Sequence, residues 1–344
     1  LRGRVVGAYQ ARNSFQDVAD AERSVFYAIG EADLSERSTF TLGVSNQNVN
    51  NTATWGGLPT AIDGSDLHLK RSSYLGSKWE YWDQNNTTAF SRLEYRFANS
   101  WKMLLSASKS WSDLNMLGSI PERMGANYDE FGQNIGRYDY EDQQNSYDGY
   151  VTGPFSLFGR THELVVGASK RIYDMTTQNY DPYAMDWPIT AGKPNFTRTD
   201  SVREVTTQDS VYATTRLSLA DPLKLILGGR LDWYDYDNRD AEGDYKVTRN
   251  VTRYAGLIYD LDEHHSVYAS YSDIFTPQSE KDTSATPLKP IVGKNYEVGV
   301  KGEYFNGALN ASLAVFRVDQ ENRAVQVFVP NCPQNACYQP SGEI

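Results

Sequence analysis

The alternation of apolar and polar side chains is clearest between residues 254 and 278, YAGLIYDLDEHHSVYASYSDIFTPQ. Successive side chains of a strand point to opposite faces, so every second residue shares a face. The apolar positions are Ala255, Leu257, Tyr259 and Leu261 in the first arm and Val267, Ala269, Tyr271 and Phe275 in the second. The polar residues between the arms predict a tight turn. This stretch therefore predicts an antiparallel hairpin with one apolar, aromatic face and one polar face.

The same unit recurs along the chain and predicts about thirteen strands. These strands cover residues 1–10, 25–34, 39–47, 87–97, 101–111, 138–152, 162–173, 204–219, 223–236, 254–261, 267–275, 295–304 and 309–319. No window sustains, over the length of a helix, the apolar spacing of three and four residues that an amphipathic helix requires. We therefore expect an all-β fold.

The connections between these strands alternate between short turns and long segments. The long segments lie at about 48–86, 112–136, 174–203, 276–290 and 321–344. Outer-membrane β-barrels have this asymmetry, with short turns on the periplasmic side and long loops outside the cell. We therefore expect residues 1–344 to form one antiparallel transmembrane β-barrel domain. Single-chain bacterial barrels have an even number of strands, so about thirteen strands indicate part of a larger barrel.

Composition narrows the alternatives without deciding the fold. The 344 residues include 24 tyrosines, and aromatic residues make up 13%. No apolar run reaches the roughly 18 residues of a membrane-spanning helix, which excludes a helical membrane protein. A mean hydropathy of -0.59 fits either a soluble β-propeller or a barrel with a polar lumen. The net charge of -11 argues against a nucleic-acid-binding surface.

The sequence carries no catalytic motif. It lacks the nucleophile elbow, the zinc-protease motif and the glycine-rich phosphate loop, which argues against an enzyme. The cluster Asp262, Glu263, His264 and His265 is interpreted as a solvated turn and not as a metal site, because adjacent side chains of a strand end diverge. Cys332 and Cys337 are the two cysteines of the chain, and their proximity predicts a disulfide in an exposed loop, with free thiols as the alternative.

Several ordered motifs resemble TonB-dependent outer-membrane siderophore receptors, in particular the ferric-pyoverdine and ferric-coprogen type. The motifs are WGGLP at 55–59, RSSYLGSKWEYWD at 71–83, GPFSLFGRTHELVVGAS at 153–169, VYASYSDIFTPQ at 267–278 and GKNYEVGVKGEYFNGALNASLAVFRVDQENRA at 293–324. The resemblance implies a barrel of about 22 strands in the outer membrane of a Gram-negative bacterium. It also implies a plug domain, through which the TonB, ExbB and ExbD complex energises import. We find no plug or TonB-contacting segment in this sequence, so we expect those functions to belong to the parent protein.

Candidate ligand contacts lie in the first two long segments. A ferric siderophore is polar and often anionic, and its flat chelating groups need aromatic faces and arginine or tyrosine donors. The candidates are Trp55, Arg71, Trp79, Tyr81, Trp82, Met116, Tyr128 and Arg137. Gly56 and Gly57 permit a tightly turned presentation of Trp55, whereas Trp79 and Trp82 equally suit loop anchoring. The siderophore itself holds the iron, so no cofactor or protein metal ligand is expected.

The leading hypothesis is a TonB-energised receptor for a ferric siderophore, with outer-membrane lipid as its other partner. A passive porin or structural barrel is the alternative, and a plug domain in the parent protein distinguishes the two. An outer-membrane hydrolase is disfavoured, because the sequence lacks the spacing of an acid, a base and a nucleophile.

Overall fold

The computed structural model describes residues 1–52, 55–124, 130–181, 184–188, 192–240, 244–329, 332 and 337–342. Within these ranges the chain forms one sheet of fifteen strands. The strands are β1 (Arg2–Asn13), β2 (Asp20–Ser35), β3 (Ser38–Asn51), β4 (Tyr81–Arg96), β5 (Lys102–Met124), β6 (Glu130–Leu157), β7 (Arg160–Asp181), β8 (Ala184–Pro188), β9 (Thr197–Ser218), β10 (Leu223–Asn238), β11 (Tyr245–Asp260), β12 (His265–Thr276), β13 (Ile291–Tyr304), β14 (Leu309–Val327) and β15 (Cys337–Gly342).

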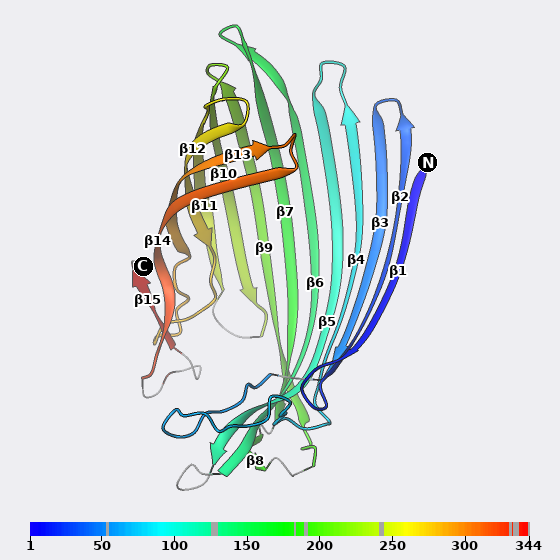
Figure 1. Cartoon of the computed structure of the whole chain (residues 1–344), viewed down its shortest axis with the longest axis vertical. Coiled ribbons are helices and arrows are strands. Elements are labelled where there is room, and N and C mark those ends of the chain that lie inside the picture. Colours follow the sequence, from blue (N-terminus) through cyan, green and yellow to red (C-terminus); the bar gives the residue numbers. More distant parts are fainter. Residues whose placement is uncertain are drawn as a thin grey trace.

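The sheet is an up-and-down meander in which each strand pairs antiparallel with the next, while β8 lies off the path and pairs with β6. The sheet curls, and β13 and β14 cross in front of β10 and β11 in the view of Figure 1. The strands β1 and β15 are its two edges. The predicted all-β antiparallel fold is confirmed, and all thirteen predicted strands are present. The alternating pattern did not predict the two short strands β8 and β15.

The two ends of the sheet differ as the sequence predicts. The tight turns β2–β3, β4–β5, β6–β7, β9–β10, β11–β12 and β13–β14 lie at one end, and the longer connections gather at the other (Figure 1). We call the latter the loop end. In the β13–β14 turn Asn306 and Gly307 have φ values of 57° and 87°. This left-handed backbone suits Asn and Gly and matches the twist of the flanking strands.

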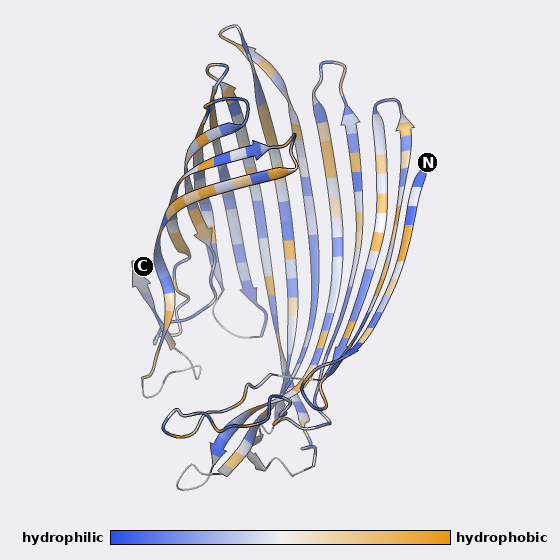
Figure 2. Ribbon diagram, in the orientation of Figure 1, coloured by the Kyte–Doolittle hydropathy of each residue, from blue (hydrophilic) through white to orange (hydrophobic). Residues whose placement is uncertain are grey.

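One face of the sheet is apolar and has little protein cover among the described residues. Leu225, Leu257, Ala269, Val298 and Val315 lie directly opposite one another on β10 to β14. Apolar and polar bands alternate along the strands (Figure 2). Leu257 is 43% exposed and Val315 is 77% exposed. The predicted apolar face of the hairpin at 254–278 is therefore confirmed, and its exposure suits contact with lipid.

The opposite face is polar and hydrogen-bonded across strands. The Asp232 carboxylate is 2% exposed and accepts hydrogen bonds from Gln208 Nε2, Ser210 Oγ and Arg230 Nε at 2.9, 2.5 and 2.8 Å. A buried carboxylate needs such hydrogen-bond donors to offset its desolvation. Farther along this face is a cavity of about 540 Å³ whose lining includes Glu31, Arg92, Ser106, Arg171 and Arg230.

Two of the long segments that we expected between strands, residues 112–136 and 174–203, are instead largely strand. Residues 112–136 belong mostly to a paired hairpin, because β5 reaches Met124 and β6 begins at Glu130. In 174–203, β7 runs to Asp181, β8 follows, and β9 begins at Thr197. Ladder hydrogen bonds join backbone groups, so the pairing continues where Gly118 and polar residues such as Ser119 interrupt the apolar alternation.

The other long segments agree better with expectation. Residues 52–80 and 277–290 lie between strands, whereas 321–344 includes the end of β14 and all of β15. The described part of the chain has no helix long and apolar enough to cross a membrane. The assignment of the long connections to the cell exterior stays a prediction.

Candidate functional site

A single cross-strand row at the loop end connects β1 to β6. Each member lies opposite the next, in the order Arg12, Ala21, Asn51, Trp82, Met116 and Tyr138. Directly opposed residues of an antiparallel pair share a face of the sheet. Ser106 of β5 lines the cavity of the polar face. Met116 lies ten residues farther along β5, an even number, and no register shift intervenes, so its side chain is on the same face. The row is therefore part of the polar, concave surface near the long connections.

Aromatic side chains occupy one half of this row. Trp55, from the segment after β3, meets the ring of Tyr138 edge to face, with ring centroids 5.4 Å apart. Tyr138 in turn lies parallel to Tyr140, with centroids 6.5 Å apart. Met116 is 5% exposed beside them, whereas Trp55 is 36% exposed. The cluster thus has a packed base and one accessible indole.

Gly56 brings Trp55 to this position. A Cβ atom on Gly56 would lie 2.1 Å from Pro121 Cδ and 3.1 Å from Ile120 Cα. Only glycine allows so close an approach of the segment to β5. Gly57 has open space around its Cα, so it is not required for the same reason.

The opposite face of the β5–β6 hairpin is a small hydrophobic core. Leu117 and Ile135 are fully buried, and Trp79, Tyr81 and Phe196 pack against them. Trp79 and Phe196 therefore hold the segments before β4 and β9 onto the hairpin, and Tyr81 packs beside them from the start of β4. Lys193 adds a cation–π contact over Tyr81, 5.6 Å from its centroid.

Polar contacts fix the segment before β4 to the same face. The Glu80 carboxylate accepts hydrogen bonds from the backbone N–H and the hydroxyl of Ser119, at 3.1 and 2.7 Å. Gln133 donates to the Leu75 carbonyl at 2.8 Å and accepts from the Ser77 hydroxyl at 3.1 Å. Burial raises the pKa of the Glu80 carboxyl, and the hydrogen bonds from Ser119 and Ser77 oppose that rise.

The two candidate arginines make contacts within the protein. Arg137 donates to Asp139 at 2.9 Å and stacks over the Tyr180 ring, 4.3 Å from its centroid. Arg71 stacks over the Phe15 ring in the β1–β2 connection, 4.8 Å from its centroid. Each arginine therefore links segments distant in sequence.

The structure thus brings together three of the eight candidates, Trp55, Trp82 and Met116, on one face. Trp79, Tyr81 and Arg137 lie on the other face of the hairpin, and Tyr128 lies outside the described residues. Their role in ligand contact stays a prediction. Sequence reasoning did not single out Tyr138, Tyr140 or Arg12, which the structure places in or beside this row. Their only signal was alternation within their own strands, which does not reveal their neighbours on other strands.

The polar cluster at the other end of the sheet forms a turn. Asp262 accepts hydrogen bonds from the backbone N–H groups of His264 and His265, both at 2.8 Å. The hydrogen bond from the His264 N–H is the first cause of the lowered pKa of Asp262, followed by the one from the His265 side chain. The His265 ring contacts Asp262 through Nδ1 at 2.9 Å and the Tyr304 hydroxyl through Nε2 at 3.0 Å. Within the described residues no group of three or more His, Cys, Asp or Glu side chains is placed to hold a metal ion.

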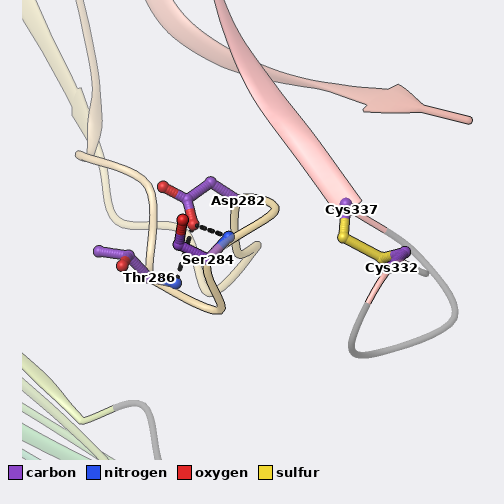
Figure 3. Close-up of a disulfide and its surroundings, with 5 residues drawn as sticks. All are labelled: Asp282, Ser284, Thr286, Cys332 and Cys337. Carbon is purple, nitrogen blue, oxygen red and sulfur yellow. Dashed lines mark hydrogen bonds between the residues drawn. A yellow bond between two sulfur atoms is a disulfide. The ribbon is translucent and has the colours of Figure 1, made fainter. Parts of the chain in front are cut away.

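The two cysteines stand at the loop end of β14 and β15. Cys332 and Cys337 are joined by a disulfide, with their Cα atoms 5.8 Å apart (Figure 3). The neighbouring connection turns around Asp282, which accepts hydrogen bonds from the N–H groups of Ser284 and Thr286. Tyr338 donates its N–H to the Lys281 carbonyl at 2.9 Å, so β15 is joined directly to this connection.

Similarity to known proteins extends over nearly the whole chain. The family model described as TonB dependent receptor-like, beta-barrel matches residues 7–343. The chain is 37% identical over 344 residues to the ferripyoverdine receptor of Pseudomonas aeruginosa, covering 94% of this chain and 42% of that protein. It is 35% identical over 373 residues to the ferric-pyoverdine M114 receptor PbuA of Pseudomonas sp. strain M114, covering 100% and 45%.

Solved structures give the same result. The crystal structure of the ferripyoverdine receptor of the Pseudomonas aeruginosa outer membrane, bound to ferripyoverdine, superposes with a TM-score of 0.86 at 34% identity. The match covers 98% of this chain and 48% of that one. The chain therefore spans about half the length of these relatives. Its match to the family model shows that the chain belongs to the TonB-dependent receptor-like β-barrel family of Gram-negative outer-membrane receptors, which are transport proteins and not enzymes.

Proposed function

We propose that this chain forms part of the barrel wall of a receptor that binds a ferric siderophore and imports it across the outer membrane. The observation that carries the proposal is the aromatic cluster of Trp55, Tyr138 and Tyr140 on the polar face at the loop end. The relatives named above as ferric-pyoverdine receptors support it, as does the 30% identity over 187 residues to the ferrioxamine B receptor of Salmonella typhimurium.

The cluster suits a flat, polar ligand. Aromatic edges and faces contact planar chelating groups favourably, and tyrosine hydroxyls add hydrogen bonds where one end of the ligand is wet. The siderophore supplies the ligands of the iron, so the protein needs to recognise only the outer surface of the complex. The packed base under Trp55 holds the indole in place before the ligand arrives, which reduces the entropic cost of binding.

Import rather than diffusion requires energy from the TonB, ExbB and ExbD complex, delivered through a plug domain in the lumen. The polar face offers such a plug domain charged and hydrogen-bonding groups, including the network around Asp232 and the cavity beside Arg171 and Arg230. A plug that fills the lumen also prevents passive leakage.

The test uses the complete protein that contains this chain, in a strain lacking its other siderophore receptors. We expect saturable binding of ferric pyoverdine or ferrioxamine B and uptake of radioactive iron from it. Uptake is expected to stop when tonB is deleted, while binding persists. Conductance for small solutes that is independent of TonB, without saturable binding of either siderophore, would instead establish a passive pore.

A further inference from the structure

A second cavity lies on the same face as the aromatic cluster, beside strands β1 and β2. It has a volume of about 540 Å³ and is bounded by β1, β2, the β1–β2 connection and the ends of β3 and β4. Its lining includes Arg12, Arg23, Asn51, Thr52 and Trp82. A cavity of this size holds part of a ligand and not a whole peptide siderophore.

The two arginines give the cavity its charge. Arg12 belongs to the row that ends at Tyr138, and Arg23 belongs to the next row on the same face, between Gln10 and Val49. Neither guanidinium forms an ion pair within the described part of the chain, whereas Arg2, Arg137 and Arg203 each pair with a carboxylate. Two cations on one face, both without an anionic partner, favour an anion between them.

The acidic residue in the lining does not serve as that partner. The Asp20 carboxylate accepts a hydrogen bond from the Thr52 hydroxyl at 2.5 Å. Within the described part of the chain, Asp20 forms no ion pair with Arg12 or Arg23. Among the charged residues that line the cavity, the arginines outnumber the aspartate by two to one.

Trp82 connects the cavity to the aromatic cluster. It lines the cavity and is also opposite Met116. Its Nε1 atom is buried and has no hydrogen-bond acceptor among the described residues.

The wall of the cavity is tied to the long connection that carries Trp55. Phe15 lines the cavity, and Arg71 covers its ring. The Asp17 N–H donates to the Ser72 carbonyl at 2.8 Å, and the Ser72 hydroxyl donates to the Asp17 carboxylate at 3.2 Å. The cavity is therefore built by two connections together, and this assigns a positioning role to Arg71.

We propose that Arg12 and Arg23 form an anion-binding subsite for a carboxylate-bearing arm of the ferric siderophore, while the aromatic cluster holds the region around the iron. This inference rests on the proposed function and specifies its ligand. Arg12 and Tyr138 are five strands apart, or roughly 24 Å at about 4.8 Å a strand, so the arm extends well beyond the chelating centre. Guanidinium groups bind carboxylates through paired, charge-assisted hydrogen bonds, which makes the subsite selective for an anionic arm.

The experiment compares two probes that share one chelating centre. One is a ferric pyoverdine with a free carboxylate on its side arm, and the other is the same molecule with that carboxylate converted to an amide. Binding to the complete protein is measured by quenching of the receptor's tryptophan fluorescence. The variants are Arg12→Gln, Arg23→Gln and the double variant. Arg4→Gln is the matched control, because Arg4 lies on the same strand and face as Arg12, eight residues nearer the tight-turn end.

We expect the unaltered receptor to bind the carboxylate form about tenfold more tightly than the amide form. The double variant should lose that preference by weakening only the carboxylate form, and Arg4→Gln should keep it. Equal affinities of the unaltered receptor for both forms, or equal losses for both in the double variant, would overturn the subsite but leave the proposed function intact. Absence of binding of either form to the unaltered receptor would overturn the proposed function itself. Retained binding of the amide form shows that a variant is folded.

Discussion

The indole of Trp55 meets the phenol ring of Tyr138 edge to face, with an interplanar angle of 85°. This contact joins a connection that follows β3 to the far strand β6, and it lies on the same face as Met116 and Trp82. Edge-to-face pairs contribute about 0.5–1.5 kcal/mol beyond the area they bury. The contact therefore holds the most accessible aromatic residue of the cluster in one orientation.

Replacing Trp55 with alanine should weaken ferric-siderophore binding by about 2 kcal/mol, since aromatic anchors in packed sites typically carry that much. The test is the dissociation constant of the ferric siderophore from the complete receptor, measured by quenching of the receptor's tryptophan fluorescence. Tyr138→Phe keeps the ring contact and should cost less than Tyr138→Ala. Phe158→Ala, in the exposed β6–β7 turn at the opposite end, is the control. Unchanged affinity of Trp55→Ala would remove this residue from the site.

Gly56→Ala should displace the segment that carries Trp55, because the added methyl group would lie 2.1 Å from Pro121 Cδ. We expect a several-fold loss of siderophore affinity with the barrel still folded. Gly57→Ala is a close control, since a Cβ atom there meets nothing within 4 Å. The same affinity assay measures both, and equal behaviour of the two variants would contradict the steric explanation.

Docking of the segment before β4 should depend on pH through Glu80. Burial raises the pKa of this carboxyl above its ordinary value of 4.5, so the docked state binds the proton more tightly than the released state. The stabilisation is therefore complete below the ordinary pKa and is lost as the pH rises through the raised one. Hydrogen exchange of residues 72–80, compared between about pH 5 and about pH 8 after correction for the intrinsic rate, should show greater protection at the lower pH.

The Glu80→Gln variant tests this assignment. A glutamine keeps an acceptor for the Ser119 hydroxyl but does not titrate, so the pH dependence of protection should flatten. If the variant retains the full pH dependence, another group is responsible.

Removal of the disulfide by Cys332→Ser together with Cys337→Ser should loosen β15. A closed loop this short stabilises the folded state by about 2 kcal/mol in the chain-entropy description. The N–H of Tyr338, bonded to the Lys281 carbonyl, should exchange faster in the variant. The N–H groups of β13 report on the rest of the sheet and should keep their protection. Unchanged exchange at Tyr338 would show that backbone pairing alone holds β15.

The fold could largely be predicted from the sequence, because strand alternation is a local property. The apolar positions at 255, 257 and 259 and at 267, 269 and 271 follow from the two-residue period alone, and the structure pairs them on one face. The asymmetry between tight turns and long connections is equally local, since each connection is counted within its own segment. Alternation failed where both faces of a strand are polar or covered by protein, as in the hairpin that contains Leu117 and Ile135.

The composition of the candidate site was decided by tertiary structure. The row from Arg12 to Tyr138 depends on five successive registers, and a shift of one residue in any of them would move the later members to the other face. The sequence indicated that Trp55, Trp79 and Trp82 lie in or beside one long connection. Only the packing of that connection separated Trp79, which lies against a buried core, from Trp55 and Trp82. Trp55 contacts Tyr138 on the polar face, and Trp82 lines a cavity of that face.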